Sequence, residues 1–407
     1  MAAYKLKDIC DKIGSGATPR GGKEAYEKEG ISLIRSQNVL DFSLSFEGLA
    51  YINEAQAEKL NNVIVEPQDV LMNITGDSVA RACIVDKTIL PARVNQHVAI
   101  IRPNEKKILS SYLLYYLQMK KRYLLQLAAG GATRNALTKG MIEELEIELP
   151  IIEIQRKIVA VLDDIQKKIQ YNSNINKNLE QQALALFKQY FMDYVPYGGV
   201  APAEWREVSL DDVCTKITDG SHYSPTDSPD SPYPMYSVKD METYGFNSSS
   251  CKHITKEDFC KLQKNDCIPL LNDILVAKDG SYLKEIFICS EQKDEAILSS
   301  IAIFRPDTQI ILPEILLYLL KQPSVRKDVG DNYVSGSALP RIVLKDFKKY
   351  RFMLPTVEEQ KKIGSVLHAI RIQIKTNVYE IHSLSFLRDA LLPKLMSGEL
   401  DVSAIDL

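Results

Sequence analysis

The sequence lacks the features that mark several large classes of protein. No apolar run reaches the roughly 18 residues that a membrane-spanning helix needs, and the start of the chain has no secretory h-region. The seven cysteines are odd in number and include no C-x-x-C pair, which disfavours a disulfide framework or a zinc site. We therefore expect reduced thiols and a cytoplasmic protein that is not bound to a membrane.

Motifs for catalysis are equally scarce. The chain has no G-x-x-x-x-G-K-(S/T) phosphate loop, no N-P-P-Y methyltransferase tetrad and no H-E-x-x-H, and its five histidines show no metal-ligand spacing. The stretch "EEQK" at 358–361 contains the E-x-K of a nuclease, but it also opens a repeated helix, where acidic residues suit the helix dipole. The sequence therefore predicts no catalytic site and no metal.

Charge alone does not indicate a nucleic-acid partner either. The formal net charge is −3, so a DNA-binding role requires basic residues gathered on one face. The 407 residues, 45% hydrophobic and 25% charged, suit a soluble protein of two or three domains.

What the sequence does contain is a long internal repeat. "LPIIEIQRKIVAVLDDIQKKI" from Leu149 returns as "LPTVEEQKKIGSVLHAIRIQI" from Leu354, with Pro150 and Pro355 separated by 205 positions. Earlier segments match at nearly the same shift: "YKLKDICDKIGSG" with "VSLDDVCTKITDG", "DVLMNITGD" with "DILVAKDGS", and "VAIIRP" with "IAIFRP". The chain is a tandem duplication in which each copy is a globular unit followed by a helix.

The helices are the clearest local prediction. From Glu153 to about Tyr194 no proline or glycine interrupts a heptad pattern of apolar residues, and the second copy repeats that pattern. Such a narrow stripe predicts two long coiled-coil helices that pair with one another. The expected interface residues are Ile158, Leu162, Ile165, Asn172, Leu179, Leu186, Ile363, Leu367, Ile370, Asn377, Leu384 and Leu391.

One polar interruption falls at the same heptad position in both copies, at Asn172 and Asn377. Two interpretations stay open. The asparagines are solvated, or they form a buried pair that fixes the register of the helices, as single core asparagines do in coiled coils.

The globular units mix short β-like runs such as "NVIVEPQDVLMNI" and "HVAIIRP" with helical stretches such as "LSSYLLYYLQMKKRYLLQL". Strands that are not regularly separated by helices predict an α+β fold. The joint "DYVPYGGVAPAEW" is rich in proline and glycine and reads as a domain boundary.

Four segments in a fixed order carry a family resemblance: "LP-x-x-E-x-Q-(R/K)-K-I" opening each helix, "ALFKQYF" closing the first, "P-x-x-W" at Trp205, and "LLPKLMSGELDV" near the end. Across essentially its whole length, the chain resembles the specificity subunit of a Type I restriction–modification system. The resemblance implies two similar target-recognition domains separated by two long antiparallel helices with pseudo-two-fold symmetry. The expected boundaries are recognition domain 1 at 1–150, helix 1 and joint at 151–197, recognition domain 2 at 198–353, and helix 2 and tail at 354–407.

The resemblance also implies partners. They are double-stranded DNA with a bipartite target, two modification (methyltransferase) subunits, and restriction subunits that translocate DNA. The chain itself is expected to bind no cofactor, with S-adenosylmethionine on the modification subunit and ATP and magnesium on the restriction subunit. If the helices set the spacing, half-sites about one helical turn apart present both major grooves on one face.

Candidate DNA contacts are polar side chains in loops that can pair with base edges, arginine or lysine with guanine and asparagine or glutamine with adenine. In the first half they are Arg20, Lys23, Arg35, Gln37, Asn38, Asn73, Thr75, Arg81, Asn95, Gln96, His97, Thr133, Arg134 and Asn135. In the second half they are Ser221, His222, Lys239, Lys278, Ser281, Ser337 and Arg341. The alternative for each is a turn-forming or capping role.

The two halves differ most where recognition is expected, since "NQHVAI" becomes "LSSIAI" and "GGATRNAL" becomes "SGSALPRI". Such differences are expected if the two units read different sequences. Competing functions are a specificity subunit of a related system outside Type I, and a nuclease in its own right. A purely structural coiled-coil protein does not explain two globular units that make up most of the chain.

Overall fold

The computed structural model describes residues 2–19, 21–130, 135–249, 251–336 and 338–404, apart from the side chains of Gly22 and Lys23. The fold is mixed helix and sheet, which confirms the expected α+β class. Its contacts divide the chain into unit 1, made of Met1–Tyr171 and Ile381–Leu407, and unit 2, made of Asn172–Glu380. Two helices of 40 residues, α6 (Ile152–Phe191) and α12 (Val357–Met396), each contribute one segment to either unit.

Unit 1 contains two four-stranded sheets, in the orders β2-β9-β6-β7 and β4-β3-β8-β5, and a two-stranded pair of β1 and β10. Its strands are β1 (Ala2–Lys5), β2 (Cys10–Ser15), β3 (Ile31–Ile34), β4 (Ala50–Ile52), β5 (Ile64–Val65), β6 (Val70–Asn73), β7 (Ala82–Ile84), β8 (Ala92–Val94), β9 (Val98–Pro103) and β10 (Glu146–Leu149). Its shorter helices are α1 (Leu6–Ile9), α2 (Glu54–Glu58), α3 (Ser110–Met119), α4 (Lys121–Ala129) and α5 (Lys139–Glu143).

Unit 2 repeats this plan with a four-stranded sheet β12-β20-β17-β18, a three-stranded sheet β16-β13-β19 and a pair of β11 and β23. Its strands are β11 (Arg206–Ser209), β12 (Cys214–Asp219), β13 (Tyr233–Tyr236), β14 (Met241–Glu242), β15 (Gly245–Phe246), β16 (Lys252–Ile254), β17 (Ile274–Ala277), β18 (Ile286–Ile288), β19 (Ala296–Ile297), β20 (Ile301–Pro306), β21 (Val334–Ser335), β22 (Arg341–Ile342) and β23 (Arg351–Leu354). Its shorter helices are α7 (Leu210–Val213), α8 (Lys256–Lys264), α9 (Pro313–Leu320), α10 (Pro323–Asn332) and α11 (Leu344–Phe347).

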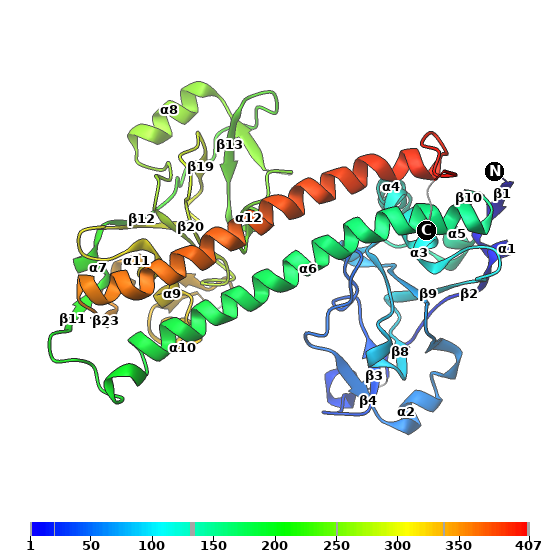
Figure 1. Ribbon diagram of the computed structural model, residues 1–407, viewed down its shortest axis with the longest axis horizontal. Coiled ribbons are helices and arrows are strands. Elements are labelled where there is room, and N and C mark those ends of the chain that lie inside the picture. Colours follow the sequence, from blue (N-terminus) through cyan, green and yellow to red (C-terminus); the bar gives the residue numbers. More distant parts are fainter. Residues whose placement is uncertain (1, 20, 131–134, 250, 337, 405–407) are drawn as a thin grey trace. The chain divides into compact units, whose positions relative to one another are not determined.

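The central strand of each unit explains why its sequence is a continuous apolar run. In β9, Ala99 and Ile101 join the core beneath α3, whereas Val98 and Ile100 join the core of the second sheet. Successive side chains of a strand point to opposite faces, so a strand buried on both faces is apolar throughout. Strand β20 is divided in the same way between two cores. In unit 1 the sheet β2-β9-β6-β7 therefore lies between the helices and the sheet β4-β3-β8-β5. In unit 2 the sheet β12-β20-β17-β18 lies between the helices and the sheet β16-β13-β19 (Figure 1).

Each globular unit is closed by a strand pair, which we call the clasp. In unit 1, β1 runs antiparallel to β10, with Ala2 opposite Leu149. In unit 2, β11 runs antiparallel to β23, with Arg206 opposite Leu354. The first and last strands of each globular unit thus lie side by side, immediately before the long helix begins.

A buried glutamine attaches each long helix to its own globular unit. Gln155 on α6 is fully buried, and its Oε1 accepts the backbone N–H of Leu109, the residue that caps α3, at 3.1 Å. Its Nε2 donates to the carbonyls of Lys107 and Pro150, both at 3.0 Å. One side chain therefore satisfies three backbone groups from two segments.

Gln360 on α12 makes the same three bonds in unit 2. Its Oε1 accepts the N–H of Leu312 at 2.9 Å, and its Nε2 donates to the carbonyls of Ile310 and Pro355 at 3.0 Å. These bonds are the physical reason for the glutamine repeated at the start of both helices.

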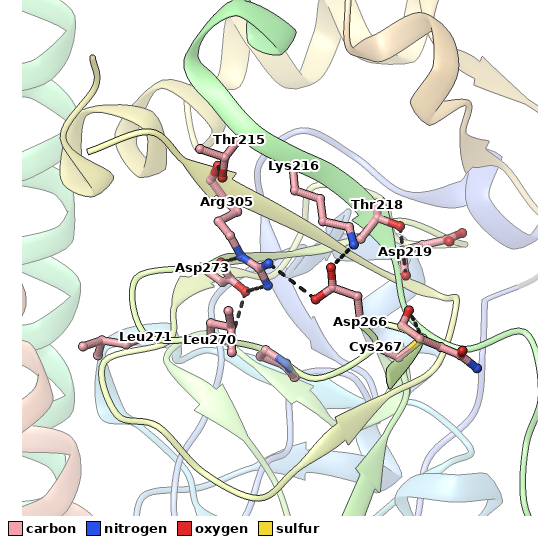
Figure 2. A network of polar contacts seen from close by, with 12 residues as sticks. Thr215, Lys216, Thr218, Asp219, Asp266, Cys267, Leu270, Leu271, Asp273 and Arg305 are labelled. Atoms are coloured by element: carbon pink, nitrogen blue, oxygen red, sulfur yellow. Dashed lines mark hydrogen bonds and ion pairs between the residues drawn. The ribbon is translucent and has the colours of Figure 1, made fainter. Parts of the chain in front are cut away.

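A second repeated feature is a buried carboxylate beneath an arginine. In unit 2, Arg305 binds Asp273 through two parallel contacts of 2.8 and 2.9 Å, and Figure 2 shows its guanidinium lying between Asp273 and Asp266. Lys216 donates to Asp266 and holds the pKa of that carboxyl below its usual value. Unit 1 has the same bidentate pair between Arg102 and Asp69, at 2.7 and 2.9 Å.

The long helices begin and end close to the predicted positions, and the heptad stripe faces inward. Of the predicted interface residues, six are buried and the others are half-buried. The stripe residues also pack against the globular unit, because Ile158 and Leu162 belong to the core of unit 1 together with residues of its sheets. The buried interface residues are Ile158, Leu162, Asn172, Ile363, Leu367 and Asn377, and the half-buried ones are Ile165, Leu179, Leu186, Ile370, Leu384 and Leu391.

Within the described residues, no helix is long and apolar enough to cross a membrane.

The heptad asparagines are buried, with exposed fractions of 2% for Asn172 and 5% for Asn377, which excludes the solvated interpretation. They do not pair with each other, however. Asn377 donates to Asn176 Oδ1 at 2.8 Å, and Asn172 donates to Glu380 Oε2 at 2.7 Å. These contacts lie within unit 2 and run in opposite directions along the two helices, so the helix segments are antiparallel.

We expect the glutamine anchor to contribute strongly to the stability of each unit. Gln360→Met keeps the side-chain volume but leaves one N–H and two carbonyls without their partner, so the free energy of unfolding should fall by about 3 kcal/mol. Trp205, the single tryptophan of the chain, is buried in the core of unit 2 and reports this transition by fluorescence in a urea titration.

Gln155→Met is the matched control, because it removes the same three bonds from unit 1. It should shift the Trp205 transition far less. An unchanged transition in Gln360→Met would show that the anchor adds no net stability.

Candidate nucleic-acid interface

Three loops that the sequence proposed separately converge at one edge of unit 1. The turn after β6 joins the start of β9 where Ile74 N–H donates to the His97 carbonyl at 3.0 Å. The same turn joins the segment before α5, since Gly76 N–H donates to the Asn135 carbonyl at 3.1 Å. Gly76 has φ 75°, a conformation that glycine adopts without strain. We call this convergence the recognition edge.

A side-chain relay ties a fourth segment to the recognition edge of unit 1. Gln96 Oε1 accepts the Thr18 N–H at 3.0 Å, which turns its NH2 toward His97 Nε2 at 3.3 Å. An NH2 group only donates, so His97 Nε2 accepts and its Nδ1–H donates to Thr75 Oγ1 at 2.6 Å. The half-exposed Thr75 hydroxyl keeps its own proton for another acceptor.

Unit 2 builds the same edge with the same backbone bonds. Lys278 N–H donates to the Ser300 carbonyl at 3.0 Å, and Gly280 N–H donates to the Pro340 carbonyl at 2.7 Å. Gly280 has φ 71°, matching Gly76.

The side chains that tie this second edge together are ionic. Lys278, 8% exposed, donates to Asp219 Oδ2 at 2.5 Å, and the other carboxylate oxygen lies 3.3 Å from His222 Nε2. The His222 side chain is 78% exposed and projects from the loop that follows β12. Asp219 was not among the sequence candidates, although it directly precedes the loop that carries His222.

The two edges therefore share a backbone frame and differ in chemistry. A threonine–histidine–glutamine relay in unit 1 corresponds to a lysine–aspartate–histidine cluster in unit 2. Both join the end of the first strand of the sheet, β2 or β12, to the turn after the strand that is third in sheet order, β6 or β17. Such an edge offers donors and acceptors on a fixed scaffold, which is what reading base edges requires.

Comparison with known proteins now decides the family. The family model of the Type I restriction modification DNA specificity domain matches residues 1–181 and again residues 202–381. The chain belongs to this specificity-domain family. The two matches also confirm the internal repeat.

Named relatives of this specificity-domain chain agree with the assignment. The Type I restriction enzyme MjaIX specificity subunit of Methanocaldococcus jannaschii is 25% identical, over 98% of this chain and 94% of the relative. The Type I restriction enzyme HindI specificity subunit of Haemophilus influenzae is 23% identical, over 98% and 99%. The crystal structure of a Type-I S subunit from M. genitalium shares the fold, with a TM-score of 0.53 at 13% identity, over 97% and 95% of the two chains.

Several candidate residues of the specificity-domain chain have internal partners. Asn38 is fully buried, accepts the Arg35 N–H at 3.1 Å and donates to the Ser45 carbonyl at 3.0 Å. Asn73 is also fully buried and donates to the Ser36 carbonyl at 2.8 Å. These amides hold the loop after β3 in place.

The remaining candidate DNA-contact residues differ in how exposed they are to solvent. Exposed residues are Gln37, Gln96, Asn135, His222, Lys239, Ser281 and Arg341; half-exposed ones are Arg35, Thr75, Arg81 and His97; buried ones, besides the two above, are Asn95, Ser221 and Lys278. Arg20, Thr133, Arg134, Ser337 and the side chain of Lys23 lie outside the described residues. Contact of any of these with DNA stays a prediction.

The ionic cluster of unit 2 should be sensitive to the loss of one partner. Asp219→Asn leaves the buried Lys278 ammonium without its carboxylate, so the free energy of unfolding should fall by about 2 kcal/mol. The double variant Asp219→Asn/Lys278→Met removes both charges and should recover at least half of this loss. Trp205 fluorescence during denaturation measures both; a double variant less stable than the single one would contradict the pairing.

Proposed function

We propose that this chain is the DNA-recognition subunit of a Type I restriction–modification complex, in which each unit reads one half of a bipartite target. The observation that carries the proposal is the recognition edge, formed twice on the same backbone frame with different side chains. A protein with two similar domains that bind two different half-sites needs the same backbone hydrogen bonds in both domains and different polar side chains on them. The exposed candidates, Gln96, His222 and Arg341 among them, are the proposed base contacts.

The chemistry of the complex is proposed to reside in partner subunits. The curated relatives are named as specificity subunits of restriction enzymes, which fits a chain that selects the site for other subunits. Modification subunits, two of them in our proposal, would carry S-adenosylmethionine, and restriction subunits would carry ATP and magnesium. In the "EEQK" segment, Gln360 is the buried anchor and Glu359 accepts from Tyr197 at 2.6 Å and Lys362 at 2.7 Å, which supports a structural role for this helix start.

The division of labour predicts that the purified chain alone transfers no methyl group. Radiolabelled S-adenosylmethionine and genomic DNA from a strain lacking the system should show incorporation only after a modification subunit is added. Methyl incorporation by the chain alone, at a rate unchanged by a second purification step, would overturn the non-catalytic assignment.

The two-reader proposal predicts that the target can be altered one half at a time. Replacing the globular part of unit 1 between its clasp strands, from Ala2 to Leu149, with that of a relative should change one half of the methylated motif. The other half should remain, because the recognition edge of unit 2 is untouched. Methylation mapping by long-read sequencing measures this.

The reciprocal exchange between Arg206 and Leu354 is the matched control and should change only the other half. A change of both halves in either exchange would show that the units do not read DNA independently.

A further inference from the structure

Unit 2 carries a polar pocket beside its recognition edge. Of the polar residues that line it, only Lys278 was a sequence candidate for DNA contact. The cavity has a volume of about 360 Å³, and its polar lining comes from Thr218, Asp219, Lys278, Lys345 and Lys348. Asp219 and Lys278 belong to both the pocket and the recognition edge. A ligand in the pocket would therefore lie next to the side chains proposed to read bases.

The three lysines are not equivalent. Lys278 is buried and already paired with Asp219 at 2.5 Å. Lys348 lies 3.7 Å from the exposed Asp211 carboxylate, beyond hydrogen-bond distance. Lys345 is exposed and makes no ion pair with any residue that the structure describes. The pocket thus offers two ammonium groups, of which that of Lys348 also forms the 3.7 Å ion pair with Asp211, whereas the half-buried Thr218 hydroxyl already donates to the Asp219 carbonyl at 3.4 Å.

The fold does not require these lysines, because unit 1 forms the same turns without them. At the shift of 205 positions, Lys345 corresponds to Gly140 and Lys348 to Glu143, and at 204 positions Lys278 corresponds to Ile74. The backbone bond from Ile342 to Lys278 has its counterpart from Leu137 to Ile74, at 3.0 and 2.8 Å. Lys345 and Lys348 therefore have no basic counterpart at the equivalent positions of unit 1, whereas Lys278 stabilises its own cluster with Asp219.

We infer that this pocket binds a backbone phosphate of the half-site read by unit 2, with Lys345 and Lys348 as the phosphate contacts. The inference rests on the proposed function, and it names a DNA contact that unit 1 lacks at the equivalent place. Lysine contacts to phosphate position a protein on the duplex and add to affinity without selecting sequence. Lys278 acts differently, as a positioning residue that holds Asp219 and the His222 loop.

Salt dependence of DNA binding tests the assignment. The full chain, assembled with its modification subunits, is titrated onto its mapped target duplex and onto a scrambled duplex between 50 and 300 mM salt. Lys345→Gln/Lys348→Gln should lower the slope of log K against log salt by about 0.9 on both duplexes, since one phosphate contact is lost. The preference for target over scrambled DNA should stay the same.

Lys349→Gln is the matched control, because Lys349 lies on the same short segment, is 74% exposed and does not line the pocket. It should leave the slope unchanged. A double variant that keeps the wild-type slope, while its Trp205 unfolding transition is normal, would overturn the inference. An equal fall of the slope in Lys349→Gln would also overturn the inference, because the fall would then reflect the general charge of the surface.

Two further outcomes separate this inference from neighbouring ones. Saturable binding of inorganic phosphate to the chain alone, lost in the double variant while the DNA slope is unchanged, would assign the pocket to a free anion and overturn the DNA assignment. A wild-type complex that does not prefer its target would refute the proposed function. The scrambled-duplex slope still decides the pocket in that case.

Discussion

The structure depends on one buried polar contact made twice. Gln155 and Gln360 each satisfy a helix-capping N–H and two carbonyls, and each does so at the point where a long helix leaves its globular unit. Unpaired backbone groups at this depth would cost about 1–3 kcal/mol each, so the orientation of the long helix relative to α3 or α9 has little freedom. The junction also connects the long helices to the recognition edges, because α3 and α9 share a core with the sheets whose ends form those edges.

Around that constant frame, evolution has varied charge without disturbing the core. The bidentate pairs Arg102–Asp69 and Arg305–Asp273 are the same in both units to within a tenth of an ångström. At the recognition edges, by contrast, unit 1 has the Thr75–His97–Gln96 relay and unit 2 has the ionic Lys278–Asp219–His222 cluster. In the unit 2 cluster only the His222 side chain is exposed, whereas Lys278 is buried and, like the buried carboxylates Asp69 and Asp273, has a partner of opposite charge.

The sequence predicted the architecture well because the evidence lay in patterns. The heptad stripe and the apolar strand runs follow from periodic burial, and the repeat at 205 positions places Gln155 on Gln360. Partners were harder to predict. The heptad position left the burial of Asn172 and Asn377 open, and their contacts with Glu380 and Asn176 depend on the stagger of two antiparallel helix segments, which no single helix encodes.

The candidate interface shows the same division. Loops that converge were identified because turn residues and strand ends are local features. Whether a polar side chain points out or in was not predictable, since Asn73, at the end of β6, is buried and holds a neighbouring loop while Asn135 is exposed, and both were candidates for DNA contact. Lys345 and Lys348 were not among the predicted DNA contacts, because in sequence they resemble the charged residues of any solvated helix. Only the fold brings Lys278, from about 70 residues earlier, to the same pocket.

The clasps have a consequence for how the family tolerates insertions. Alignments with the relatives extend over 430 and 467 positions, longer than this chain of 407 residues, so residues are gained or lost between members. Since β1 pairs with β10 and β11 pairs with β23, an insertion in a loop between them lengthens a segment whose two ends are already held together. The cost of a longer loop grows only with the logarithm of its length. Recognition loops can therefore grow or shrink within a clasp while the start of the long helix stays where it is.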